Sequence, residues 1–126
     1  MKYFSIYLPD PNTNAGPPNA EQQATMQQFV QEAAARGEFL SGGGFLSLAE
    51  HGAVLQRVDG TTRVVDGPYV ESKELVGGFA LLNYPSRAAA VDGARRFLEA
   101  AGDGECMTYQ IMEGSHADPQ NGDGGS

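Results

Sequence analysis

The fold is decided by the stretch Leu75-Val76-Gly77-Gly78-Phe79-Ala80-Leu81-Leu82-Asn83-Tyr84. It is the most apolar strand that the sequence predicts. Successive residues of a strand point to opposite faces of its sheet, and from Phe79 to Tyr84 both faces are apolar. A sheet with helices on one side and water on the other would instead alternate apolar and polar residues. We therefore expect this strand to be covered on both faces.

A second strand is predicted over Met1–Leu8, where alternation places Phe4 and Ile6 on one face and Tyr3 and Tyr7 on the other. We expect the helices of the domain to cover the face that carries Phe4. The face that carries the tyrosines then needs another cover, and a second copy of the chain is the simplest one. The sequence therefore predicts a homodimer.

Two amphipathic helices are predicted. One begins at Asn19 and runs to Arg36, where Gly37 ends it. The other runs from Ser86 to Ala101, and its inward-facing residues are Ala90, Val91, Ala94, Phe97, Leu98 and Ala101. Asp59-Gly60 lies between two β-rich runs and predicts a hairpin, because a two-residue turn of this kind needs positive φ angles. The hairpin strands are Val54–Val58 and Thr61–Val65, and the last predicted strand is Glu105–Met112.

The predicted order is β-α-β-β-α-β with an inserted β-hairpin. This order is typical of a ferredoxin-like α+β plait, in which two helices cover one face of a mostly antiparallel sheet. The run Gly42-Gly43-Gly44 predicts a bend or bulge between β segments. Residues 1–113 form the predicted domain, and residues 114–126, rich in Gly, Asp and Asn, predict a flexible tail.

Length and charge exclude several classes of function. The 126 residues provide one domain with one core. Acidic residues number 16 against 8 basic ones, and the net charge of −8 opposes binding to nucleic acid or an anionic membrane. No signal peptide and no apolar run of roughly 20 residues is found, so we expect a cytoplasmic protein. The single cysteine and the isolated His51 and His116 lack metal-site spacing, and neither a metal nor another cofactor is predicted.

The most distinctive motif is Asp66-Gly67-Pro68-Tyr69-Val70-Glu71-Ser72-Lys73-Glu74-Leu75-Val76-Gly77-Gly78-Phe79. It resembles the signature of the YCII-related family, in the branch named for its Asp-Gly-Pro-Phe tetrapeptide, with Tyr69 at the phenylalanine position. The resemblance extends in order and spacing from Met1 to about Met112. It implies a dimeric α+β barrel built from two ferredoxin-like protomers, with a cleft near the dimer interface.

The resemblance implies two alternative functions. The first is binding of a small organic ligand in the cleft, with cofactor-free acid–base chemistry of the isomerase or lyase kind. The second is a non-catalytic accessory protein that regulates a partner, because members of this branch are often encoded beside, or fused to, sigma factors of the extracytoplasmic-function type. The founding branch has a histidine on its first helix, whereas this chain has none before His51, so any catalysis must use other groups.

The candidate catalytic residues are Asp66, Glu71 and Lys73. Asp66 either fixes a turn through nearby backbone N–H groups or acts as a general base or substrate anchor. Lys73 is a candidate to bind a carboxylate or phosphate while Glu71 moves protons. The alternative is that these two residues and Glu74 form a solvated patch with a weak ion pair.

The candidate ligand-binding residues are Tyr3, Tyr7, Arg63, Tyr69 and Glu74. Tyr3 and Tyr7 either pack in the dimer interface or line an aromatic cleft in which their hydroxyl groups orient a ligand. Arg63 either binds a ligand anion or is simply exposed on the predicted hairpin. The sequence leaves both pairs of alternatives open.

Overall fold

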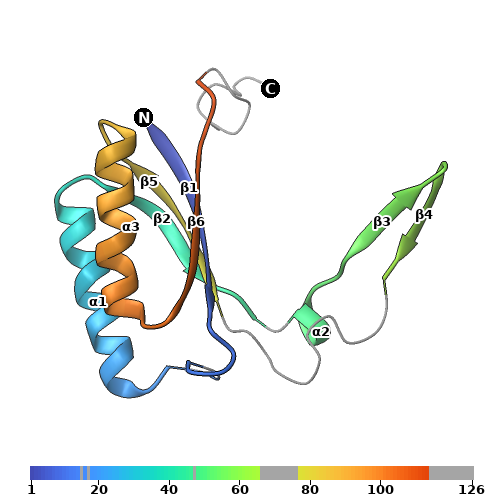
Figure 1. Cartoon of the computed structure of the whole chain (residues 1–126), viewed down its shortest axis with the longest axis horizontal. Helices are drawn as coiled ribbons and strands as arrows, with labels where there is room; N and C mark the ends of the chain where they lie inside the picture. Colours follow the sequence, from blue (N-terminus) through green and yellow to red (C-terminus); the bar gives the residue numbers. More distant parts are fainter. Residues whose placement is uncertain (15, 17, 47, 66–76, 114–126) are drawn as a thin grey trace.

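The computed structural model describes residues 1–14, 16, 18–46, 48–65 and 77–113. Two long helices lie on one face of a four-stranded antiparallel sheet, and a separate two-stranded hairpin completes the α+β fold (Figure 1). This arrangement confirms the predicted α+β class. In chain order the elements are β1 (Lys2–Pro9), α1 (Ala20–Ala35), β2 (Phe39–Gly44), α2 (Leu48–His51), β3 (Leu55–Val58), β4 (Thr61–Val64), β5 (Gly78–Asn83), α3 (Arg87–Ala101) and β6 (Gly104–Gln110).

The strands of the main sheet lie in the order β2-β5-β1-β6, and every neighbouring pair is antiparallel. The apolar strand β5 therefore lies inside the sheet, between β1 and the edge strand β2. Residues that pair directly across two strands share one face of the sheet. Tyr3 pairs with Leu82 and Tyr7 pairs with Gly78, which places all four residues on the same face.

The tyrosine face of β1 is the face that the helices cover, so the predicted assignment of faces was wrong. Tyr3 forms a buried cluster with Tyr84 and Ala90, the latter on α3. The ring of Tyr7 packs edge-on against Phe97 of α3, with 5.2 Å between ring centroids. Alternation determines which residues share a face but not which face receives the helices. Because both faces of β1 carry large apolar residues, the sequence pattern did not decide between them.

Local capping chemistry sets the ends of both long helices as predicted. The Asn19 side chain accepts a hydrogen bond from the backbone N–H of Gln22, and the Gln22 side chain accepts one from the N–H of Asn19. Such caps typically contribute about 1 kcal/mol to stability. Gly37 follows the helix at a φ of +78°, which only glycine adopts readily. Ser86 caps α3 through its side-chain oxygen.

Helix α3 differs from the prediction in the residue that it turns toward the sheet. Val91, expected to face inward, is 42% exposed, and the buried positions are Ala90 and Gly93. The hydroxyl group of Tyr84 lies where a Cβ atom on Gly93 would be. Glycine is therefore required at this turn of the helix for the buried tyrosine to fit.

The three glycines of β2 lie within the strand rather than at a bend, which corrects the prediction. The irregularity lies before the glycines, where the pairing of β2 with β5 shifts its register between Phe39 and Ser41. A Cβ atom on Gly42 would lie only 2.6 Å from the carbonyl oxygen of Phe79 on β5 and 2.9 Å from the Phe39 ring. The close approach of these two strands explains the glycine.

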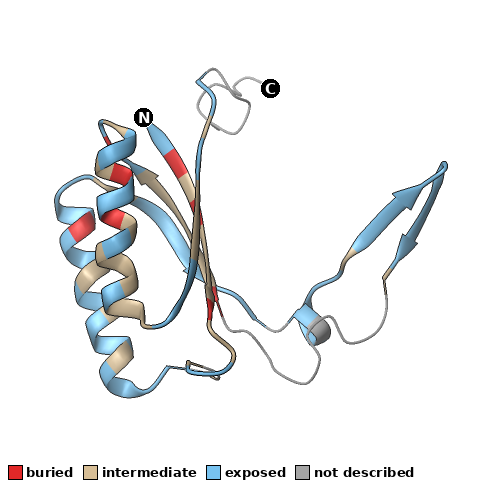
Figure 2. Ribbon diagram, in the orientation of Figure 1, coloured by how far each residue is buried: buried red, intermediate tan, exposed pale blue. Residues whose placement is uncertain are grey.

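The predicted hairpin is confirmed as β3–β4, with Asp59 and Gly60 at φ angles of 52° and 80° in its turn. It extends away from the helices and the main sheet (Figure 1), and all of its strand residues are exposed (Figure 2). Its apolar residues Leu55, Val58 and Val64 are each more than half exposed. The hairpin therefore has no hydrophobic core of its own.

None of the described helices is long and apolar enough to cross a membrane. The predicted tail, residues 114–126, lies outside the described residues.

Candidate functional site

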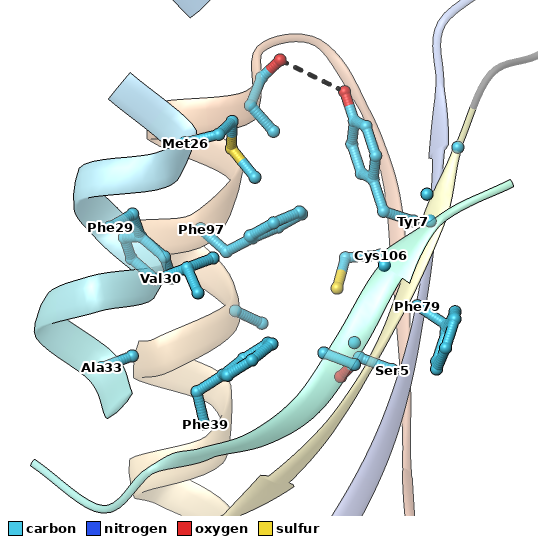
Figure 3. Close-up of a pocket in the computed structure, with 18 of the residues that line it drawn as sticks. Ser5, Tyr7, Met26, Phe29, Val30, Ala33, Phe39, Phe79, Phe97 and Cys106 are labelled. Atoms are coloured by element: carbon cyan, nitrogen blue, oxygen red, sulfur yellow. Dashed lines mark hydrogen bonds between the residues drawn. The ribbon is translucent and has the colours of Figure 1, made fainter. Parts of the chain in front are cut away.

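A cavity of about 540 Å³ separates the two long helices from the sheet (Figure 3). We call it the helix–sheet pocket. Met26, Phe29 and Val30 reach it from α1, and Phe97 reaches it from α3. Its volume lies within the range of roughly 300–1,000 Å³ that is usual for small-molecule sites. The pocket is the candidate functional site.

Small residues facing one another across the two layers create the helix–sheet pocket. On the sheet side, Gly42 pairs with Ala80 and Gly44 pairs with Gly78, which places these residues on the helix-facing side. On the helix side, α3 contributes Ala94 and Ala101. Protein interiors are normally packed to the density of organic crystals. Here the side chains are too short to fill the space between the layers, so it remains open.

Aromatic rings form the wall of the pocket on the helix side. The Phe97 ring packs edge-on against Tyr7 and against Phe29, with centroid distances of 5.2 Å and 5.9 Å. Figure 3 shows that Phe39 also points toward the cavity, whereas the Phe79 ring points away from it, on the opposite face of the sheet. The wall therefore offers ring faces and edges to an apolar ligand.

Polar groups gather at one end of the pocket, around the Tyr7 hydroxyl group, which Figure 3 shows making a hydrogen bond at that end. This hydroxyl group donates toward the carbonyl oxygens of Gly102, at 3.1 Å, and Asp103, at 3.0 Å. It accepts a hydrogen bond of 3.1 Å from the side-chain amide of Asn14, whose oxygen accepts one of 3.3 Å from Gln22. The network joins β1, the loop before α1, the start of α1 and the end of α3.

The ionisation of Tyr7 follows from this position. Burial raises the pKa of its hydroxyl group above the ordinary value of 10.0, and the negative charge of Asp103 adds to the rise, while the hydrogen bond from Asn14 opposes it. Tyr7 is therefore a neutral phenol near neutral pH. No described residue that lines the pocket is Asp, Glu, Lys, Arg or His. The described lining is therefore predominantly apolar and suited to holding an apolar molecule.

A family model of the YCII-related domain matches residues 1–114. The chain belongs to the YCII-related family. No curated protein matches it. The match covers the whole helix–sheet pocket, so the pocket lies within the YCII-related domain.

The YCII-related domain brings only one of the described candidate residues, Tyr7, to the pocket. Tyr3 is 3% exposed, packs edge-on against Tyr84 at 6.2 Å, and does not line the cavity. Arg63 is exposed on β4, where its guanidinium group donates a hydrogen bond to the side chain of Gln56. The structure therefore does not bring Tyr3, Tyr7 and Arg63 together in one site.

The remaining candidates lie outside the described residues. They are the catalytic candidates Asp66, Glu71 and Lys73 and the ligand-binding candidates Tyr69 and Glu74. Their roles stay predictions. Gly77, which follows this segment directly, is buried and lines the helix–sheet pocket.

Sequence reasoning missed the helix–sheet pocket itself. The available signal was the set of small residues on the inward faces of β2, β5 and α3. The run Gly42-Gly43-Gly44 was interpreted as a feature of the backbone alone, although glycine also removes the side chain that would fill the core. Cys106, the single cysteine, is half-buried at the pocket wall.

Proposed function

We propose that this YCII-related protein binds a small, largely apolar organic molecule in the helix–sheet pocket. The observation that carries this proposal is the cavity of about 540 Å³, which is lined by aromatic rings and by the glycines of β2 and β5. Leaving so much apolar surface without a packing partner lowers stability. A ligand that fills the pocket would recover those contacts, and the gain in stability would be coupled to binding.

Titration with N-phenyl-1-naphthylamine, an uncharged fluorescent probe, tests this proposal. Its emission should rise on binding, and Ala94→Leu should abolish the rise because the larger side chain fills the cavity from α3. Ala88→Leu is the matched control, since Ala88 lies on the same helix but is exposed. Equal binding by the two variants, or no binding by the native protein, would contradict the proposal. Should Ala94→Leu fail to fold, Gly44→Val on β2 places its side chain in the same cavity.

The single cysteine provides an independent test of where the probe binds. Cys106 lines the pocket, and the chain has no other thiol. Bound N-phenyl-1-naphthylamine should therefore slow alkylation of Cys106 by iodoacetamide. An unchanged rate at saturating probe would place the bound molecule elsewhere.

We also propose that two copies associate through the sheet face opposite the helices, as a dimeric α+β barrel of ferredoxin-like protomers. The strand order β2-β5-β1-β6 supports the plait. The opposite face supports the association, because it carries a stacked row of Phe4, Phe79 and Phe45, with ring centroids 6.0 Å and 5.8 Å apart. Light scattering should give twice the mass of the chain. Phe4→Glu should halve that mass and Ala88→Glu should not, and a native monomer would refute the association.

The Asp-Gly-Pro-Phe branch, the cytoplasmic location and the catalytic roles of Asp66, Glu71 and Lys73 belong to the same proposal. The motif from Asp66 to Phe79 supports the branch. If these residues perform chemistry, Glu71→Gln and Lys73→Met should keep probe binding and lose turnover of the physiological substrate. The accessory role predicts a stoichiometric protein partner and no turnover.

A further inference from the structure

The helix–sheet pocket is free of charge over its described lining. Of its described residues, only Tyr7, Tyr84 and Cys106 have side chains that ionise, although 19% of the whole chain is charged. Burial raises the pKa of both tyrosines, so both are neutral near neutral pH. Moving an ion from water into surroundings without an opposite charge is very costly. The described part of the lining therefore disfavours ions of either sign.

Most polar side chains of the described lining are already hydrogen-bonded within the protein. The hydroxyl groups of Ser5 and Thr108 bond to each other at 2.9 Å, and the side chains of Asn14 and Gln22 are bonded to each other and to Tyr7 or the backbone. No buried side-chain nitrogen or oxygen in the described part of the chain lacks a partner. A ligand with several polar groups would therefore find few partners in the pocket.

A charge close to the polar end of the pocket has the wrong sign for an anion. It belongs to Asp103, whose negative charge acts on the Tyr7 hydroxyl group. The Asp103 carboxylate accepts a hydrogen bond of 2.8 Å from Thr13 and does not line the pocket. An anion at this end would be repelled, and a cation deeper in the pocket would meet no carboxylate of the described lining.

From these three observations we infer that the physiological ligand is an uncharged, predominantly apolar molecule with at most one or two neutral polar groups, such as a hydroxyl or carbonyl group. The inference rests on the proposed binding in this pocket and specifies its chemistry. The ligand's polar group lies at the Tyr7 end, where a small shift of the hydroxyl group allows it to bond with the ligand. The apolar body lies between Phe97 and the glycines of β2 and β5.

Three naphthalene compounds that differ in charge test the inference in the native protein. They are 1-naphthalenemethanol, which is neutral, 1-naphthoate, which is an anion, and 1-naphthylmethylamine, which is a cation near neutral pH. Each is titrated against bound N-phenyl-1-naphthylamine. The neutral alcohol should displace the probe at a concentration at least about tenfold lower than either ion, a ratio that corresponds to about 1.4 kcal/mol of binding free energy.

The possible outcomes separate the inference from the proposed function. Equal or better displacement by 1-naphthoate or by the amine, with probe binding itself lost in Ala94→Leu and kept in Ala88→Leu, would overturn the inference and leave the pocket as a binding site. Probe binding that Ala94→Leu does not alter, or no binding by any of the compounds, would overturn both. Because the three compounds share one ring system, their ring size and shape cannot explain a difference between them.

Discussion

The two ends of the helix–sheet interface are built from similar helix residues and have opposite packing. At one end Tyr3 and Tyr84 lie over Ala90 and Gly93, and every one of these residues is buried. At the other end, the sheet presents Gly44 and Gly78 toward the helices, and the space stays open. Small residues on α3 are common to both ends. What decides between a core and a cavity is whether the sheet supplies a large side chain opposite them.

Truncating Tyr84 should open a cavity at the packed end as well. Tyr84→Ala is expected to lower the free energy of unfolding by about 3–5 kcal/mol, as is usual when a buried aromatic residue is truncated. Urea denaturation measures the loss. Leu55→Ala is the control, because Leu55 is 60% exposed on the hairpin strand β3. A loss for Tyr84→Ala no greater than that of the control would refute the distinction between the two ends.

Two glycines on the same strand should respond differently to a methyl group. Gly42→Ala is expected to cost about 1–3 kcal/mol, because the new Cβ would lie 2.6 Å from the backbone oxygen of Phe79. Gly44→Ala is expected to cost nothing and to add up to about 1 kcal/mol, because its nearest neighbour is 3.7 Å away and the unfolded chain loses freedom. Thermal denaturation of the two variants gives the comparison. Equal destabilisation by Gly42→Ala and Gly44→Ala would mean that Gly44 is tightly packed and does not face an open cavity.

The hydroxyl group at the polar end of the pocket should make a smaller contribution. Tyr7→Phe removes the hydrogen bonds to Asn14 and to the end of α3 while keeping the ring against Phe97. We expect a loss of about 1 kcal/mol in the free energy of unfolding, the usual net value for a hydrogen bond. Probe binding should persist, because the aromatic wall remains. Loss of probe binding would show that the hydroxyl group of Tyr7, and not only its ring, is needed for binding.

Alkaline pH should weaken the fold through the tyrosines of both ends. Burial raises the pKa of Tyr7 and of Tyr84 above 10.0 in the folded state. The unfolded chain therefore releases these protons first, and the free energy of unfolding should begin to fall as the pH rises through 10.0 and continue to fall up to the folded pKa values. The decline should be smaller in Tyr7→Phe than in the native protein. A stability that stays constant or increases across this range would contradict the prediction.

The features that the sequence predicts correctly depend on neighbouring residues. Asn19 caps α1, Gly37 ends it, and Asp59-Gly60 forms the hairpin turn because each effect acts within a few bonds. The misassigned features depend on contacts between distant segments. Val91 is exposed since Tyr84, which precedes the helix, lies against Gly93 instead.

The helix–sheet pocket could not be predicted by the same local rules. A glycine in a strand is compatible with a bulge, a close approach of strands or a missing side chain. The choice among these depends on what lies opposite, and the cavity that Gly44 lines is also lined by Ala94 and Ala101, on a helix some fifty residues later. The sequence makes Tyr7 a candidate for the dimer interface or an aromatic cleft near it, and the structure places it between the helices and the sheet.

Strand β2, which lines the pocket, is also an edge strand of the sheet. Among the described strands β2 pairs with β5 alone, and three of its six residues are glycines that contribute no side-chain contacts of their own. Local fraying at such a margin requires less free energy than moving either long helix. The strand that bounds the cavity is therefore also the part of its wall that opens at the lowest free-energy cost. The rates of ligand association and dissociation would then follow the local separation of β2 from β5.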